Sequence, residues 1–155
     1  MSTICIAVLQ DQKPINHSAK KELCNILQNK SLYCFFDLKY HEPFLENIGK
    51  YQCVSISDDS EFDNCEMFLL PDRCFYNGKT NLLPFSDRMS VLEDVTSVLQ
   101  KNEYQVEWFI GDSGTPFDEF QTLECLTCDL SKVIAQNFFD FKTAVQKDIH
   151  IIVKS

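Results

Sequence analysis

Glycine, proline and basic residues are scarce in this sequence, and each scarcity excludes a class of protein. The 155 residues include only 4 glycines and 5 prolines, too few for a fibrous or low-complexity chain. Acidic residues number 23 against 14 lysines and arginines, which gives a formal net charge of -9. Such a chain repels phosphate backbones and anionic lipid headgroups, which argues against binding to nucleic acid or membrane. No stretch approaches the roughly 20 apolar residues that a membrane helix needs.

The sequence contains 8 cysteines, yet their positions do not favour disulfides. The opening segment, MSTICIAVLQDQ, lacks the basic start and the long apolar run of a secretory signal. Most cysteines fall in segments predicted to be buried strands, where a reduced thiol packs as a small hydrophobe. We therefore expect a cytoplasmic protein with free thiols. The one C-x-x-C pair, Cys125 and Cys128, lacks the second pair that zinc needs and precedes a helix, so no metal, redox site or cofactor is expected.

The apolar pattern predicts an α+β fold. Short apolar or alternating runs are typical of strands, which we expect at residues 3–9, 32–38, 51–57, 64–70, 104–110 and 148–154. Apolar residues at helical spacing predict helices at 18–29, 87–101 and 129–138, with Ser18, Ser86 or Asp87, and Asp129 as N-caps. Segment 122–128 fits either a strand or a helix. The predicted fold is a mixed, largely antiparallel sheet of about six strands covered by about three helices, in a single domain spanning residues 1–155.

Residues 111–114, Gly-Asp-Ser-Gly, form the motif that most invites a catalytic interpretation. They resemble the residues around the nucleophilic serine of chymotrypsin-like proteases, but the resemblance ends with these four. Thr115 stands where that family has another glycine, and 155 residues are too few for the family's double barrel. The segment also lacks the nearby basic residue of a phosphate-binding loop. The sequence therefore predicts that Ser113 is a turn residue, that Asp112 caps its own backbone, and that the chain has no catalytic residue.

The acidic residues are concentrated in two segments that contain no lysine or arginine. Together these segments, 51–72 and 102–131, hold 13 of the 23 acidic residues. Both are centred between predicted strands and hence at the surface, where like charges repel, so folding alone gives no reason to collect them. A cationic partner is one reason, and a solvated acidic face without a partner is the other. The residues predicted to bind the partner are Asp58, Asp59, Glu61, Asp63, Asp112, Asp118, Glu119 and Glu124, with Phe117 and Phe120 as aromatic contacts.

Composition and charge together favour a non-enzymatic binding protein. A small acidic domain without a catalytic motif has the physical profile of bacterial toxin-immunity proteins, although no motif connects it to them. The expected partner is a basic protein such as a nuclease toxin, whose phosphate-attracting active site also attracts carboxylates. Two alternatives stay open. One is a small metal-dependent enzyme in which Asp112, Asp118 and Glu119 bind Mg²⁺, and the other is an assembly or adaptor subunit with an acidic docking face.

Overall fold

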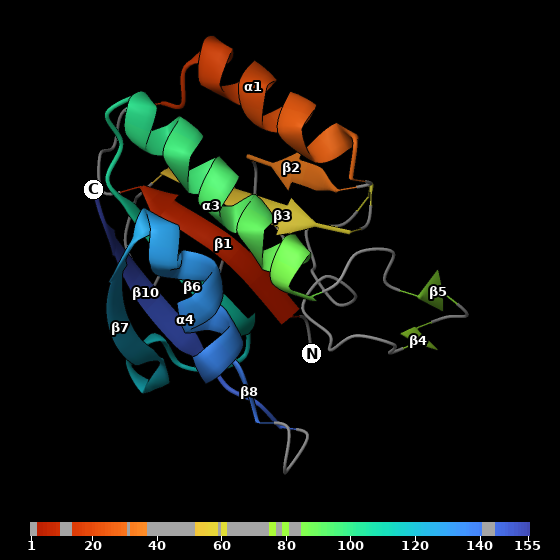
Figure 1. Cartoon of the computed structure of the whole chain (residues 1–155), viewed down its shortest axis with the longest axis vertical. Coiled ribbons are helices and arrows are strands. Elements are labelled where there is room, and N and C mark those ends of the chain that lie inside the picture. The colour runs from red at the N-terminus through yellow and green to blue at the C-terminus, as the bar shows by residue number, and fades with distance from the viewer. Residues whose placement is uncertain are drawn as a thin grey trace.

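A six-stranded sheet with helices on one face organises the chain (Figure 1). The computed structural model describes residues 3–9, 14–30, 32–36, 52–58, 60–61, 75–76, 79–80, 85–140 and 145–155. The strands of the sheet are β1 (Thr3–Leu9), β2 (Tyr33–Phe35), β3 (Gln52–Ser57), β6 (Val106–Asp112), β7 (Gln121–Leu126) and β10 (Ile149–Lys154). Their order is β2-β3-β1-β6-β10-β7, and every neighbouring pair is antiparallel except β10 with β7. This confirms the predicted mixed, largely antiparallel α+β sheet.

Two short hairpins accompany the main sheet. Strands β4 (Phe75–Tyr76) and β5 (Lys79–Thr80) form one pair, and β8 (Phe139–Asp140) and β9 (Val145–Gln146) form the other. The strand predicted at 64–70 lies outside the described residues.

The helices lie on one face of the sheet and bury the faces that their sequence periodicity predicts (Figure 1). They are α1 (His17–Gln28), α3 (Phe85–Lys101) and α4 (Leu130–Asn137). The apolar positions on which the prediction of α3 rested are all buried, and these are Val91, Leu92, Val95, Val98 and Leu99. Together with one face of the central strands they form the larger of two apolar cores. Packing of these amphipathic helices, more than their intrinsic propensity, fixes their positions.

The N-termini of α1 and α3 differ from the predicted ones, because capping depends on side-chain geometry that residue type alone does not fix. Asn16 caps α1, since its Oδ1 accepts a hydrogen bond from the Ala19 amide at 2.8 Å. The predicted cap Ser18 is wrong, because it lies inside the helix. Ser86 and Asp87 are wrong for the same reason, as α3 already begins at Phe85.

The N-terminus of α4 is capped from another helix. Asp129 is the N-cap residue of α4, as predicted, but its side chain makes no capping hydrogen bond. Instead, Glu93 of α3 accepts hydrogen bonds from the Ser131 amide at 3.1 Å and the Ser131 hydroxyl at 2.8 Å. A carboxylate near the positive end of a helix is favourable, and here it also joins α3 to α4.

The ambiguous segment 122–128 is mainly a strand. Residues 121–126 form β7, and the 3-10 turn η3 (Thr127–Asp129) follows before α4 begins. Strand β6 begins at Val106, two residues later than predicted, although Tyr104 is buried as its apolar character suggested. The hydroxyl of Tyr104 donates to the Pro14 carbonyl at 2.9 Å, which ties this turn to the segment before α1.

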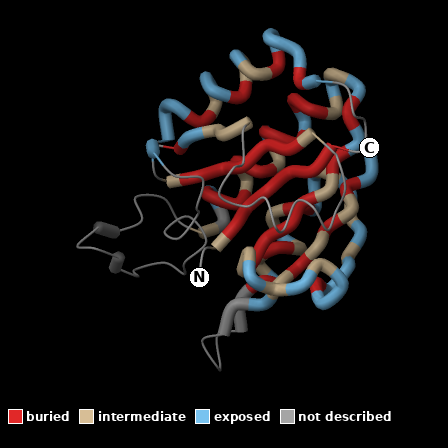
Figure 2. Tube along the Cα trace, turned by 180° about the vertical axis from the view of Figure 1, so that it is seen from behind, coloured by how far each residue is buried: buried red, intermediate tan, exposed pale blue. Residues whose placement is uncertain are grey.

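The centre of the sheet is buried on both faces, as the red strands in Figure 2 show. Away from the helices, a second apolar cluster consists of Ile4, Ile6, Val8, Cys53, Phe109 and Phe120. Strand β1 is buried on both faces, which is consistent with the continuous apolar run in its sequence, TICIAVL. Strand β6 likewise contributes to both clusters, with Trp108 and Ile110 in the larger one and Phe109 in the smaller one.

Helix α3 ends in a left-handed residue that is not glycine. Glu103 has φ 68°, and the Tyr104 amide donates to the Leu99 carbonyl at 3.1 Å, which is the pattern of a Schellman motif. We expect Glu103→Gly to raise the free energy of unfolding by about 0.5–1 kcal/mol, because glycine adopts this φ without steric cost. Urea denaturation measures the change. The control Ser97→Gly, at an exposed position inside α3, should instead lower the free energy by about 0.5 kcal/mol. A destabilising effect of Glu103→Gly would contradict the prediction.

Candidate functional site

The loop with the Gly-Asp-Ser-Gly motif is held in place by Asp148, the residue just before β10. One carboxylate oxygen of Asp148 accepts from the Asp112 amide at 2.7 Å, and the other accepts from the Thr115 hydroxyl at 2.8 Å. The Asp112 carboxylate accepts from the Gly114 amide at 2.8 Å, which confirms that Asp112 caps its own loop. Ser113 lies in the turn between them, as predicted. Asp148 had no signal in the sequence, because it is 36 residues away from Asp112 along the chain.

The histidine of β10 is hydrogen-bonded within the sheet. His150 Nε2 lies 2.9 Å from Glu107 Oε1, and Nδ1 lies 3.3 Å from the Thr122 hydroxyl. Its ring stacks on Phe109 with the centroids 4.2 Å apart. Both ring nitrogens therefore have partners other than Ser113, and the geometry is that of a structural histidine spanning three strands.

Strand direction brings acidic residues from both segments to the same end of the sheet. Strands β3 and β6 finish at this end, whereas β7 and β10 begin there. We call it the acidic end, and its acidic residues are Asp58, Glu61, Asp112, Asp118, Glu119 and Asp148. Four strand spacings separate β3 from β7, so the charges extend over roughly 19 Å. The exposed Lys147 lies at the same end and offsets part of this charge.

The predicted partner-binding residues differ in their exposure to solvent. Asp118 and Glu119 are exposed in the 3-10 turn η2 (Phe117–Glu119), and Glu61 is exposed after β3. Asp58 and Asp112 are half-buried. The predicted residues Asp59 and Asp63 lie outside the described part of the chain.

Aromatic rings fix η2 to the sheet. Phe117 and Phe120 pack against Phe109, with ring centroids 5.4 and 5.7 Å apart. Phe120 is only 6% exposed and Phe117 is half-buried. These two rings hold the turn so that the side chains between them, Asp118 and Glu119, face solvent. A charged turn held in this way loses little conformational entropy when a partner docks on it.

Glu124 is separated from the acidic end and has a cationic neighbour. It lies on β7, and its Oε2 is 3.0 Å from Lys154 Nζ on β10. Both side chains are more than half exposed, so the pair contributes at most about 1 kcal/mol. Segment 102–131 contains no lysine or arginine, but in the fold Lys154 from the end of the chain lies next to it. This compensation was invisible in the sequence because it depends on the parallel pairing of β7 with β10.

Cys125, near the end of β7, is poorly suited to act as a nucleophile. Burial raises the pKa of Cys125 to about 11, and the nearby Asp129 and Cys128 contribute to the rise. Cys125 is therefore a protonated thiol at neutral pH and a weak nucleophile. It lines a depression of about 520 Å³ between β7 and α4, together with the opposite charges of Asp129 and Lys132. In the described part of the chain, no group of three or more His, Cys, Asp or Glu side chains is placed to hold a metal ion.

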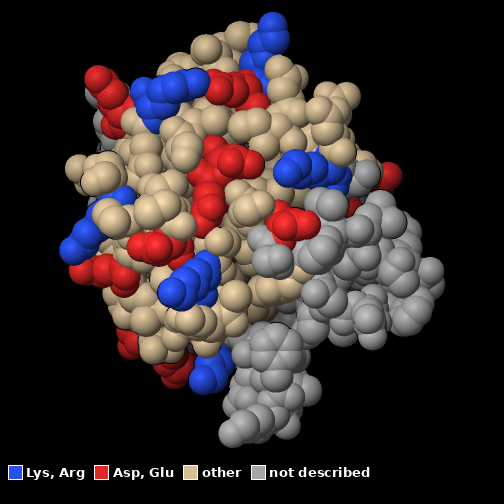
Figure 3. Space-filling model, viewed as in Figure 1, with Lys and Arg blue, Asp and Glu red and all other residues tan. Residues whose placement is uncertain are grey.

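The helix-covered side has a different charge pattern from the acidic end. Acidic and basic side chains are interspersed over the helices (Figure 3). One pair joins α3 to α1, with Lys101 Nζ 2.8 Å from Glu22 Oε1. This side therefore presents no field of a single sign to a partner.

Two further findings bear on function. Across the described ranges, every helix is too short or too polar to cross a bilayer. The thiols found there, including Cys24 and Cys128 at the surface, are free. No family model, curated protein or solved structure matches this chain, so its function is inferred from the geometry of the acidic end.

Proposed function

We propose that this chain is a non-enzymatic binding protein whose acidic end docks on a basic protein, as an inhibitor of the immunity or antitoxin type. The observation that carries the proposal is the strand topology, which gathers acidic residues from two distant segments at one end of the sheet. A nuclease toxin is the partner class that fits best, because a site that attracts phosphates also attracts carboxylates. The free cysteines fit a cytoplasmic location.

The arrangement of the acidic end suits electrostatic recognition better than catalysis. Its carboxylates come from several elements and extend over roughly 19 Å, whereas ligands of one metal ion must lie within a few ångströms of it. Two of the carboxylates, those of Asp112 and Asp148, are already used as hydrogen-bond acceptors inside the loop. The exposed pair Asp118 and Glu119 is left to face a partner. Charges placed in this way accelerate encounter with a basic surface and favour binding at low salt.

The double variant Asp118→Lys/Glu119→Lys tests the proposal. A matched control, Asp94→Lys/Glu103→Lys, changes the net charge equally but at exposed positions on and just after α3, outside the acidic end. Each protein is used as bait in a lysate of the cells in which the chain occurs, and the affinity of the retained basic protein is then measured. At low salt we expect the test variant to bind about tenfold or more weakly and the control to change binding less than about threefold.

The captured protein must then be assayed for nuclease activity with and without the chain. Inhibition that is lost with the Asp118→Lys/Glu119→Lys variant supports an immunity-type role. Equal weakening by both variants would show that net charge, and not the acidic end, controls binding. Failure to retain any basic protein at low salt would overturn the proposed function.

A further inference from the structure

We propose that the free edge of β7 accepts an extended segment of the basic partner, which then becomes a seventh strand of the sheet. This inference rests on the proposed function, because it assigns the chemistry of the partner segment from the charge of the chain. It adds a second recognition element, based on backbone hydrogen bonds, to the electrostatic attraction of the acidic end.

Strand β7 is the outer strand of the sheet and is exposed along its length. Within the described residues it pairs only with β10, over six consecutive positions and without a bulge. Its residues 121, 122, 124 and 126 are exposed, and Leu126 at 49% is one of the two large apolar side chains classed as exposed in the described ranges. The other outer strand, β2, has only three residues and offers a much shorter edge.

The hydrogen-bond pattern shows which backbone groups point outward. The Gln121 amide donates to the Asp148 carbonyl at 3.0 Å, so Gln121 faces β10. Because the backbone N–H and C=O groups of successive strand residues point to opposite sides, residues 123 and 125 also face β10. The amides and carbonyls of Thr122, Glu124 and Leu126 therefore face the free edge, where an added strand would bind them.

The edge also lacks the features that usually prevent strand addition. Exposed edge strands in soluble proteins commonly carry lysine, proline or a bulge. The β7 sequence QTLECL has neither lysine nor proline, and its register with β10 is continuous. Its one charged residue, Glu124, is acidic.

The negative charge of the chain favours a basic partner over a second copy of this chain as the occupant of the edge. Two copies would bring together chains of net charge -9, and a symmetric antiparallel pair centred on the outward residues would place Glu124 opposite itself. Like charges directly opposite each other destabilise a strand pair. Lys154 offsets part of the charge of Glu124, so a segment of alternating lysine or arginine and apolar residues would be attracted mainly by the exposed Asp118 and Glu119 at one end of β7 and Asp129 at the other.

The test uses a short synthetic peptide of alternating lysine and valine, followed by NMR of the backbone amides of the full chain. We expect the amide signals of Thr122, Glu124 and Leu126 to shift and to become protected from hydrogen exchange. The same peptide methylated at every backbone nitrogen keeps its charge but cannot form a strand ladder, so its affinity should fall by about tenfold or more. A glutamate–valine peptide should not bind.

A pair of variants checks the edge from the side of the protein. Thr122→Pro removes an outward amide without touching the ladder to β10, whereas Thr122→Val removes the same hydroxyl and keeps the amide. The proline variant should bind the lysine–valine peptide about tenfold more weakly than the valine variant. If the proline variant does not fold, the methylated peptide tests the same hydrogen bonds on the unaltered chain.

The outcomes separate this inference from the proposed function. Equal binding of methylated and unmethylated peptides would overturn strand addition while leaving the electrostatic role intact. Equal binding of the glutamate–valine peptide would overturn the assignment of a basic partner. Self-association of the wild-type chain that Thr122→Pro abolishes would identify a second copy as the occupant and overturn the inference.

Discussion

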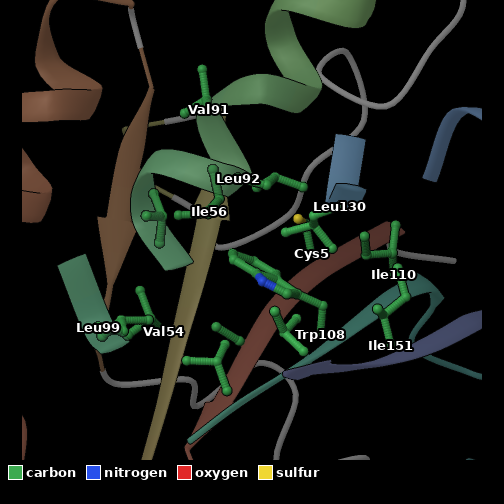
Figure 4. Packing of buried hydrophobic residues seen from close by; sticks show 14 of the residues in the cluster. Cys5, Val54, Ile56, Val91, Leu92, Leu99, Trp108, Ile110, Leu130 and Ile151 are labelled. Atoms are coloured by element: carbon green, nitrogen blue, oxygen red, sulfur yellow. The ribbon is translucent and has the colours of Figure 1, made fainter. Parts of the chain in front are cut away.

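Replacing Trp108 with alanine is expected to lower the free energy of unfolding by about 4 kcal/mol, a large part of the roughly 5–15 kcal/mol that stabilises a typical domain. The Trp108 side chain is fully buried between the helices and the sheet. Figure 4 shows it surrounded by side chains from both layers, including Cys5, Leu92, Leu130 and Ile151. Removal of the indole would leave a large cavity where these elements meet, and a close-packed core collapses only partly around such a cavity.

The indole also has a specific hydrogen-bond partner. Trp108 Nε1 donates to the Thr96 hydroxyl at 2.8 Å, and that hydroxyl donates to the Leu92 carbonyl at 2.7 Å. Thr96→Val would leave the buried N–H without an acceptor, at a cost of about 1–3 kcal/mol. Trp108→Phe removes the donor instead. If the hydrogen bond stabilises the fold, the double variant Thr96→Val/Trp108→Phe should lower the free energy of unfolding by about 1 kcal/mol less than the sum of the two single effects.

Urea denaturation followed by circular dichroism measures each member of this set. The control is Ser97→Ala, at an exposed position of α3 next to Thr96, which should change stability by less than about 0.5 kcal/mol. Strictly additive losses would show that the Thr96–Trp108 contact contributes nothing. If Trp108→Ala lowered the free energy of unfolding by less than about 1 kcal/mol, the ring would not have the central role in packing that the structure indicates.

Gly111→Ala should lower the free energy of unfolding by about 3 kcal/mol and disorder the loop that follows β6. Gly111 has φ 151°, a backbone conformation that residues with a side chain rarely adopt. An added Cβ would lie 2.9 Å from the Asp148 Cα and 3.0 Å from its Cγ. Relief of that contact would move the carboxylate that accepts from the Asp112 amide and the Thr115 hydroxyl.

The neighbouring glycine gives a matched control. Gly114 is exposed in the same loop, and Gly114→Ala should change stability by less than about 1 kcal/mol. The two variants are compared by urea denaturation and by the amide signal of Asp112, which should shift only in Gly111→Ala. If both variants had the same stability and the same Asp112 amide signal, the close approach of Gly111 to Asp148 would not contribute to stability.

Secondary structure was largely predictable because its signals are local. The run TICIAVL, the alternation around Trp108 and the helical spacing of Val91, Leu92 and Val95 each identify an element from adjacent residues. The N-cap position was predicted correctly for α4 but not for α1 or α3. A serine or aspartate near a helix start is only a candidate, and the observed caps use Asn16 for α1 and the distant Glu93 for α4.

The candidate site was predictable in composition but not in arrangement. The absence of basic residues from 51–72 and 102–131 identified the acidic segments. The placement of Asp58, Asp112 and Asp118 at one end of the sheet depends on the directions of β3, β6 and β7, which no local pattern specifies. Asp148 and Lys154, which respectively hold the loop and offset the charge of Glu124, come from β10 and its approach, far along the chain.

Most of the strands and helices, the acidic character of the chain and the turn at Ser113 could be predicted from the sequence. Hydrophobic periodicity, net charge and turn chemistry are properties of neighbouring residues and of sums over the chain, so they need no knowledge of the fold. The strand order, the parallel pairing that leaves β7 at the edge, and the gathering of acidic residues at one end could not be predicted in this way. These features depend on contacts between residues far apart in the chain, whose energies are realised only when the whole core packs.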